Sequence, residues 1–364
     1  MRHIALIKFG ALGDVLRTTG LLRPLLARHP RAAITWITRP AALPLLQRNP
    51  YVQDVVAVRA AFPAALRRRR FDLILSMDDE PAACALASQL RGREVIGAYL
   101  TNDGRCAYTA ASAPWFRLGL LNRSSNGTLT RANALKQRNR LTYPDQWRRI
   151  LRLDRHGYPE TYRPMLRLAR AERAAAQRWA ARHLPADRVR IGMNPSAGER
   201  WSAKRLPPAR AATLTRLLHR QLGARVLLYG GPDEHRSHRQ TLRQAGMAAV
   251  DMGTHHSLRR FAALVDLCDV LITSDSLALH VAQALGKPAV CFFGPTAAQE
   301  IELFGKGVAL IPQPSCRCFY RATCTRQRSC VAAIPLMQFV AGVRTALALA
   351  TARDTPQPVR PAAT

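Results

Sequence analysis

The chain has 364 residues, 48% of them apolar, which is enough for one large or two medium α/β domains with a substantial core. Its formal net charge is +32, from 55 basic and 23 acidic residues. No apolar run reaches the roughly 18 residues of a membrane-spanning helix, and Lys8 interrupts the N-terminal apolar run, which is not typical of a signal peptide. We therefore expect a cytoplasmic protein.

The positive charge comes almost entirely from arginine, because only five of the basic residues are lysines. One interpretation is a biased composition. The other is a surface that meets a polyanion, such as nucleic acid, an anionic membrane or a phosphorylated glycolipid. Charge alone does not choose between them.

The first half of the chain is expected to alternate strands and helices. Apolar patterning predicts a strand at residues 3–9, a glycine loop at 10–13 and an amphipathic helix at 14–28. Further strands are expected at 34–38, 52–58, 71–76 and 94–99, and residues 120–147 are expected to be helix and loops.

The second half repeats this pattern after a helix at 170–183. Strands are expected at 189–193, 225–229, 250–253, 269–273 and 289–293, and Pro207 and Pro208 mark a helix start. We predict an N-terminal domain at 1–170, a C-terminal domain at 185–335, a helix at 336–351 and a disordered tail at 352–364.

A polar turn between the strand at 269–273 and a helix at 276–285 has the features of a ligand site. It places Asp275 and Ser276 beside the free N–H groups of a helix N-terminus, where an anion or a ribose hydroxyl is readily held. His280 follows close to the face of Ser276. The site would lie at the carboxyl edge of a parallel sheet.

Four motifs occur in one order along the chain: IKFGALGDVLRTT at 7–19, NPSAGERWSAKRLPPAR at 194–210, YGGPDE at 229–234, and the segment at 273–296. Together they resemble the family 9 glycosyltransferases, whose best-known members are ADP-heptose:lipopolysaccharide heptosyltransferases. The resemblance implies an α/β protein with the GT-B fold, in which two Rossmann-like domains face each other across a cleft. The N-terminal domain would bind the acceptor and the C-terminal domain the nucleotide-sugar.

Asp14 follows the glycine loop and matches the aspartate that serves as proposed general base in this family. The alternative is a helix cap, which contributes about 1 kcal/mol. A helix N-terminus stabilises the carboxylate and weakens it as a base, so much of its value would come from positioning.

The resemblance also implies a donor site. Lys204 would bind the donor diphosphate; the alternative is a solvated loop lysine. Glu234 would lie near the ribose or base; the alternative is an acid in the first turn of a helix. His280 could instead be a helix histidine satisfied by a neighbouring carbonyl. Leu277 replaces a glycine that many heptosyltransferases carry, which puts the identity of the donor in doubt. The expected donor-site residues are Ser196, Gly198, Lys204, Gly231, Glu234, Asp275, Ser276, His280, Gly294, Pro295 and Thr296.

On the acceptor side we expect Lys8, Gly13, Asp78 and Asp79 to contact the acceptor or its phosphates. Lys8 could equally be a buried lysine paired with Asp14 or another carboxylate. Asp78 and Asp79 end a strand of the acceptor domain, and this position suits binding of acceptor hydroxyls better than binding of a donor metal ion.

Four cysteines lie within 15 residues near the C-terminus: Cys316, Cys318, Cys324 and Cys330. They could hold a structural zinc or iron ion, remain as packed thiols, or form disulfides. The spacing between Cys316 and Cys318 differs from the C-x2-C pair of a standard zinc ribbon.

The resulting hypothesis is an inverting glycosyltransferase that moves heptose from ADP-heptose to the lipopolysaccharide inner core, with no cofactor needed for catalysis. Its partners would be an ADP-sugar, an anionic glycolipid and the cytoplasmic face of the inner membrane, touched peripherally. The alternatives are a related transferase with another nucleotide-sugar or acceptor, or a basic nucleic-acid-binding protein. No helix-turn-helix, zinc finger or aromatic-interleaved basic motif supports the last, so no nucleic acid is expected.

Overall fold

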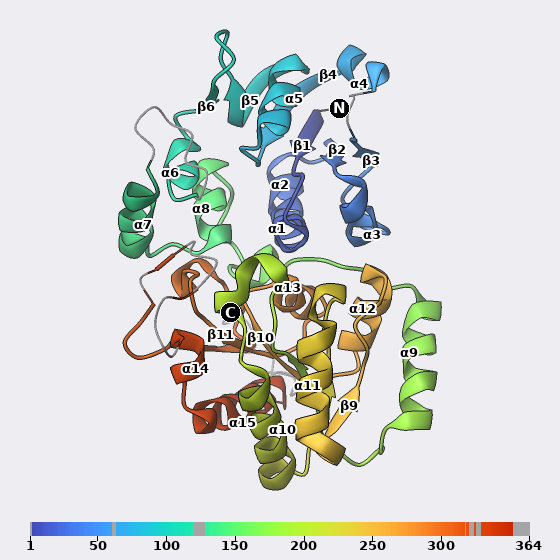
Figure 1. The fold of residues 1–364 in the computed structure, drawn as a ribbon. Coiled ribbons are helices and arrows are strands. Elements are labelled where there is room, and N and C mark those ends of the chain that lie inside the picture. The colour runs from blue at the N-terminus through green and yellow to red at the C-terminus, as the bar shows by residue number, and fades with distance from the viewer. Residues whose placement is uncertain are drawn as a thin grey trace, which may run out of the picture.

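The computed structural model describes residues 2–59, 63–119, 128–316, 318, 319, 324 and 329–351. Each half of the chain builds one six-stranded sheet, and the two halves lie one above the other in Figure 1. The expected α/β class with the GT-B arrangement is confirmed.

The first sheet has the order β3-β2-β1-β4-β5-β6, parallel except for the antiparallel pair of β5 and β6. Its strands are β1 (His3–Ile7), β2 (Ala33–Thr38), β3 (Asp54–Ala57), β4 (Arg70–Ser76), β5 (Arg91–Leu100) and β6 (Cys106–Tyr108). Helical segments of this half are α1 (Leu12–Thr18), η1 (Thr19–Leu21), α2 (Leu22–Arg28), η2 (Pro40–Ala42), α3 (Leu43–Leu46), α4 (Ala64–Arg68), α5 (Pro81–Gln89), α6 (Ala113–Phe116), α7 (Leu129–Arg138), α8 (Tyr143–Ile150) and η3 (Glu160–Tyr162).

The second sheet has the order β12-β11-β10-β7-β8-β9 and is parallel throughout. Its strands are β7 (Arg190–Asn194), β8 (Arg225–Leu228), β9 (Ala249–Asp251), β10 (Val270–Ser274), β11 (Ala289–Phe292) and β12 (Gly307–Leu310). Helical segments of this half are α9 (Arg170–His183), η4 (Glu199–Lys204), α10 (Pro208–Leu222), η5 (Pro232–Glu234), α11 (His235–Ala245), η6 (Gly246–Ala248), α12 (Leu258–Val265), α13 (Leu277–Ala284), η7 (Ala298–Glu300), α14 (Cys330–Ala333) and α15 (Leu336–Thr351).

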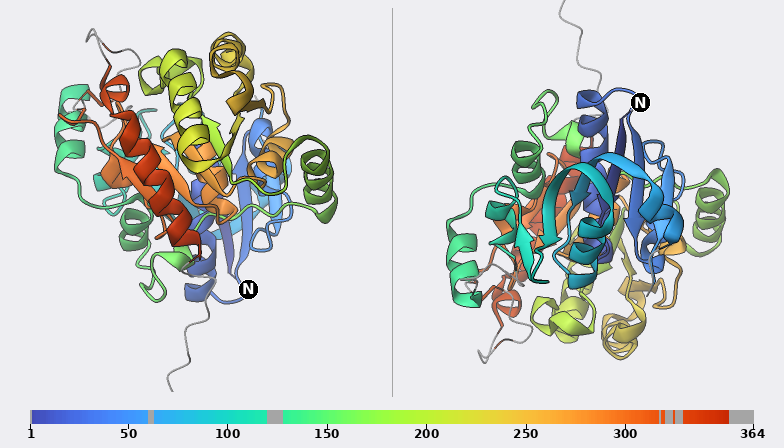
Figure 2. Two further views of the ribbon diagram at one scale, coloured as in Figure 1. Left: turned by 90° about the horizontal axis from the view of Figure 1, so that it is seen from below. Right: turned by 90° about the horizontal axis from the view of Figure 1, so that it is seen from above.

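Both sheets are buried on both faces, which explains the nearly continuous apolar strands. In β1, Ile4 and Leu6 belong to one core cluster while Ala5 and Ile7 belong to another, as expected when successive side chains point to opposite faces. α15 runs across one face of the second sheet, and α9 lies at the edge of the molecule (Figure 2), where it packs against α12.

The predicted strands are all present within three residues at each end, but β6 and β12 were not expected. The single helix predicted at 14–28 is wrong, because η1 separates α1 from α2. At this point Gly20 lies so close to η3 that a Cβ atom would come within 2.1 Å of the Tyr162 carbonyl oxygen. The predicted tail at 352–364 lies outside the described residues.

Strand order determines where a ligand can bind. In each sheet the order reverses beside the first strand, between β1 and β4 and between β7 and β10. Loops that leave the carboxyl ends of such strands diverge and open a crevice. The predicted site residues Asp14, Asp78, Ser196 and Asp275 follow these four strands, so both crevices carry them.

Candidate active site

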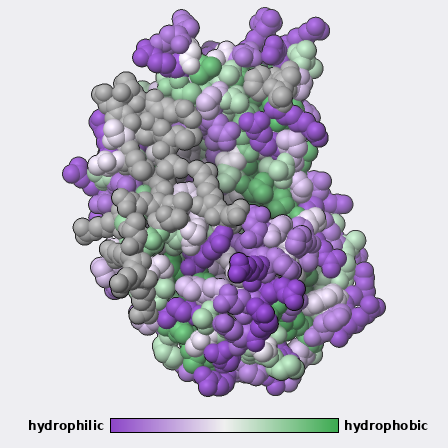
Figure 3. Space-filling model, in the orientation of Figure 1, coloured by the Kyte–Doolittle hydropathy of each residue, from purple (hydrophilic) through white to green (hydrophobic). Residues whose placement is uncertain are grey.

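A cavity of about 1030 Å³ opens between the two halves, and residues from the carboxyl edges of both sheets line it. α1 of the first half faces α13 of the second across this boundary (Figure 1). Hydrophobic residues gather between the halves in the view of Figure 3, and hydrophilic ones cover much of the rest of that face. A cavity of this size accommodates a nucleotide-sugar.

Asp14 lies in the first turn of α1 and lines the cavity, with 34% of its side chain exposed. Its Oδ2 accepts from the Ala11 N–H at 3.3 Å, and its Oδ1 lies 2.9 Å from Arg17 Nη2. Asp14 therefore caps its helix and also faces the cavity. Burial raises the pKa of Asp14, but Arg17, and after it Lys8 and His280, outweigh burial and hold the pKa below its usual value.

Asp78 organises the glycine loop. Its Oδ2 accepts from the N–H groups of Phe9 at 2.7 Å and Gly10 at 3.2 Å, and lies 3.3 Å from Lys8 Nζ. Burial disfavours the Lys8 ammonium, but Asp78 and then Asp14 raise its pKa. Lys8 is thus a buried lysine whose nearest carboxylate is Asp78. Asp79 accepts from the Tyr108 hydroxyl at 3.1 Å.

Lys204 and Asp275 meet on the opposite wall. Lys204 Nζ donates to the Asp275 carbonyl oxygen at 2.9 Å, lies 3.7 Å from Asp275 Oδ2, and sits 5.3 Å from the centre of the Trp201 ring. Burial raises the pKa of Asp275, but Lys204 and then His280 outweigh burial and lower it. Lys204 is therefore a nine-tenths buried cavity lysine rather than a solvated one.

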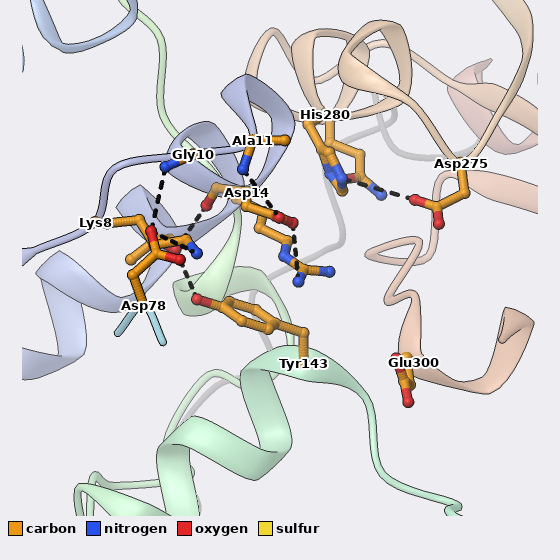
Figure 4. Close-up of polar contacts among 12 residues, drawn as sticks. Lys8, Gly10, Ala11, Asp14, Asp78, Tyr143, Asp275, His280 and Glu300 are labelled. Atoms are coloured by element: carbon orange, nitrogen blue, oxygen red, sulfur yellow. Dashed lines mark hydrogen bonds and ion pairs between the residues drawn. The ribbon is translucent and has the colours of Figure 1, made fainter. Parts of the chain in front are cut away.

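His280 connects the two walls, since it lies between Asp14 and Asp275 in the view of Figure 4. Its Nε2 is 3.9 Å from Asp275 Oδ1, and its Nδ1 is 3.1 Å from Gln283 Oε1. Burial, and then Arg17, lower the pKa of His280, so the ring is neutral at pH 7. A neutral ring can donate or accept a hydrogen bond at a ligand without adding charge.

Glu234 joins two loops of the second half. Its Oε1 accepts from the Gly198 N–H at 2.7 Å, and its Oε2 accepts from the Gly231 N–H at 2.7 Å. This buried acid shapes its loops in the same way as Asp78 shapes the glycine loop of the first half.

Most predicted site residues line the cavity. They are Lys8, Gly13, Asp14, Asp78, Asp79, Ser196, Gly198, Lys204, Gly231, Glu234, Asp275, Ser276, His280 and Thr296. Gly294 and Pro295 do not. Gly294 lies behind the wall, where a Cβ atom would come within 3.0 Å of the Ala203 carbonyl oxygen and 2.8 Å of Val331.

Gly13 marks a close approach of the two halves, since a Cβ atom there would lie 2.9 Å from the His280 ring and 3.4 Å from the Leu277 Cα. We expect Gly13→Ala to lower the free energy of unfolding by about 1–3 kcal/mol, the usual cost of overpacking. Thermal unfolding measures this. Gly10→Ala is the control, because its Cβ would meet nothing within 4 Å. Equal midpoints for both variants would contradict a tight contact between α1 and α13.

Sequence patterns did not indicate the pair of Lys136 and Glu300. Lys136 on α7 and Glu300 in η7 come from opposite halves, their charged atoms lie 2.6 Å apart, and each side chain is only 8% exposed. Burial lowers the pKa of Lys136, and Glu300 opposes this effect. The pair is 164 residues apart in sequence, and the scarcity of lysine was the one available signal.

The charge of the cavity contrasts with that of the chain. Among the described residues, eight acids line it against three lysines and one arginine, Arg17. The surplus of arginines therefore lies outside the described part of the cavity wall.

The four cysteines of the C-terminal cluster do not line the cavity. Burial raises the pKa of the Cys316 thiol to about 12; a backbone hydrogen bond from Cys318 opposes this shift, and Cys330 adds to it. Within the described residues, no group of three or more His, Cys, Asp or Glu side chains is arranged to hold a metal ion. Residues 317, 320–323 and 325–328 of this loop are not described, and metal binding stays a prediction.

Elemental analysis of protein purified without chelator tests that prediction. We expect about one zinc or iron ion per chain, lost together with stability when both Cys324 and Cys330 are replaced by serine. Cys106→Ser, outside the cluster, should keep the metal. Native protein without metal, and with an equally stable double variant, would leave the cluster without this role.

Across the part of the chain that the structure describes, no helix is both long and apolar enough to span a membrane.

Two Rossmann-like halves that share one cavity are the arrangement of the GT-B fold. The model of glycosyltransferase family 9 (heptosyltransferase) matches residues 59–326. The chain belongs to this family and is a glycosyltransferase, as expected from the motifs.

Solved structures agree with this fold. A family 9 glycosyl transferase from Veillonella parvula DSM 2008 is similar with a TM-score of 0.72 and 18% identity, covering 95% of this chain and 97% of that one. The E. coli ADP-heptose lps heptosyltransferase II is similar with a TM-score of 0.66 and 18% identity, covering 98% of this chain and 100% of that one. For the E. coli heptosyltransferase WaaC with ADP the TM-score is 0.56 and the identity 15%, with 95% of this chain and 99% of that one covered. No curated protein matches the chain.

Proposed function

We propose that the protein is an inverting transferase that moves heptose from ADP-heptose to a hydroxyl of the lipopolysaccharide inner core. The family supports the class of reaction, and the similarity to two E. coli structures, the ADP-heptose lps heptosyltransferase II and the heptosyltransferase WaaC with ADP, supports the donor. The observation that carries the proposal is one cavity with Asp14 on one wall and Lys204 with Asp275 on the other.

In this mechanism Asp14 takes the proton of the acceptor hydroxyl as the acceptor oxygen forms a bond to the anomeric carbon. The bond between that carbon and the diphosphate breaks, and its electron pair leaves on the phosphate oxygen. Lys204 and the N–H groups at the start of α13, next to Ser276, face the developing charge. These fixed donors supply charge stabilisation from the protein itself.

Glu234 and Asp78 support the reaction indirectly. Each holds the backbone of a loop whose N–H groups and side chains border the ligand, so the cavity wall is formed before the substrates arrive. Glu234 would lie near the donor ribose or base, beside the loops that it joins.

The acceptor would be an anionic glycolipid at the cytoplasmic face of the inner membrane. The arginines outside the cavity would meet its charged groups and the membrane surface, while the cavity itself receives the hydroxyl-bearing sugar.

A donor screen tests this proposal. Purified protein is incubated with an inner-core oligosaccharide acceptor and one nucleotide-sugar at a time: ADP-heptose, ADP-glucose, UDP-glucose or GDP-mannose. We expect a product heavier by one heptose with ADP-heptose and little or no product with the others. Turnover with a UDP- or GDP-sugar alone would overturn the donor assignment and leave the glycosyltransferase class in place.

A further inference from the structure

Arg17 is the one arginine that lines the described part of the active-site cavity, in a chain of 50 arginines. Its side chain is 17% exposed. The guanidinium carbon lies 4.1 Å from the centre of the Tyr143 ring and 5.7 Å from that of Trp115. A guanidinium packed over aromatic rings keeps a fixed orientation.

The free end of this guanidinium meets Asp14. Nη2 lies 2.9 Å from Asp14 Oδ1, while Asp14 Oδ2 accepts only the longer bond from the Ala11 N–H at 3.3 Å. Arg17 Nε is buried and has no hydrogen-bond partner among the described residues. The Arg17 guanidinium therefore pairs with Asp14 at one end and packs with its face against the rings of Tyr143 and Trp115.

The groups around Asp14 come from three elements. Arg17 lies on the same helix, Lys8 at the end of β1, and His280 with Asp275 on or before α13. Burial raises the pKa of Asp14. Among the charges that lower it, Arg17 has the largest effect, followed by Lys8 and His280, whereas Asp275 acts in the opposite direction.

We propose that Arg17 is a positioning residue of the transfer reaction: it holds the carboxylate of Asp14 toward the acceptor hydroxyl, and Tyr143 and Trp115 hold Arg17 in turn. This inference rests on the proposed function, in which Asp14 is the base. Arg17 takes no proton. The acceptor proton moves to Asp14, and the arginine keeps that carboxylate in one orientation and in its charged form until then.

An ion pair three residues apart on a helix also occurs for stability alone. The two roles differ in pH dependence. If Arg17 only stabilised α1, its loss would lower the unfolding midpoint and leave the pH profile of transfer unchanged. If it positions and charges the base, its loss raises the pKa of Asp14, and the acid limb of kcat/KM moves to higher pH.

The test compares Arg17→Met, which keeps bulk against the rings, with Arg17→Lys, which keeps the charge. Arg23→Met is the matched control, because Arg23 is an exposed arginine of α2 outside the cavity that donates to the Tyr51 hydroxyl. For Arg17→Met we expect kcat to fall about 10- to 100-fold, with KM for ADP-heptose within about twofold. The acid limb of its kcat/KM profile should move to higher pH by about one pH unit or more.

Arg17→Lys should restore the position of the limb, and Arg23→Met should match the parent protein. An unchanged limb with kcat within twofold in Arg17→Met would overturn the proposal. The carboxyl carbon of Asp14, followed by NMR during a pH titration, gives a readout without turnover. If the parent protein transfers no sugar, the proposed function fails, whereas an Asp14 pKa that is the same in parent and Arg17→Met removes the link between these two residues.

Discussion

Asp14→Asn is expected to reduce sugar transfer by about 10²- to 10⁴-fold while ADP binds as before. The factor is the usual contribution of a general base. An amide oxygen can still accept the Ala11 N–H, so the start of α1 stays capped, but the amide cannot take a proton. Product mass measures transfer, and calorimetry with ADP measures donor binding.

Asp103→Asn is the control for Asp14→Asn, since Asp103 is an exposed loop aspartate that pairs with Arg105 away from the cavity. Full activity in Asp14→Asn would show that Asp14 acts as a helix cap alone. A parallel loss of ADP affinity would instead place it in the donor site.

The pH profile of the parent enzyme follows from the same carboxylate. The pKa of Asp14 lies below its ordinary value, because Arg17, Lys8 and His280 together outweigh burial. Asp14 therefore stays ionised as pH falls through the ordinary range of aspartate, and the base is lost only below that range. Burial, and then Arg17, lower the pKa of His280, so the ring is neutral near pH 7 and adds its positive charge beside Asp14 only once it is protonated at lower pH.

Short apolar runs were sufficient to predict ten of the twelve strands. β1 is such a run, and its Ile4 and Ile7 face different core clusters because the sheet is buried on both faces. The edge strands β6 and β12 were missed; they have only three and four residues, too few to establish a pattern.

Most of the residues that the motifs singled out line one cavity, but the motifs did not reveal the partners of these residues. That Asp78 and Glu234 would bind loop backbone, and that Gly294 would pack behind the wall, depends on how the loops fold in space. Lys136 and Glu300 meet only when the two halves are assembled. No local pattern encodes a contact over so long a separation.

Arg17 shows a second reason why the sequence alone does not identify every residue of the site. It was part of a quoted motif, yet nothing distinguished it from the other arginines until the cavity and the Tyr143 ring were known. In an arginine-rich chain, residue type carries little information about function, whereas the rare lysines Lys8, Lys136 and Lys204 all line the cavity.

Lys204→Ala is expected to weaken ADP binding by about 1.5–3 kcal/mol, the range for a hydrogen bond to a charged group. Lys204 is the lysine beside the donor-side turn, with Nζ 2.9 Å from the Asp275 carbonyl oxygen. Its removal takes away a cation for the diphosphate and leaves the Asp275 carboxylate without its strongest stabilising charge. Isothermal calorimetry with ADP gives the change in affinity directly.

Lys287→Ala is the matched control for Lys204→Ala. Lys287 belongs to the same half but does not line the cavity, and its Nζ lies 3.4 Å from Asp266 Oδ1. It should bind ADP as the parent protein does. If Lys204 and backbone N–H groups meet the phosphate charge, as proposed, chelator should leave the ADP affinity of the parent unchanged. Unchanged affinity in Lys204→Ala would remove this lysine from the donor site, and a loss on chelation would show that a metal ion shares the phosphate charge with it.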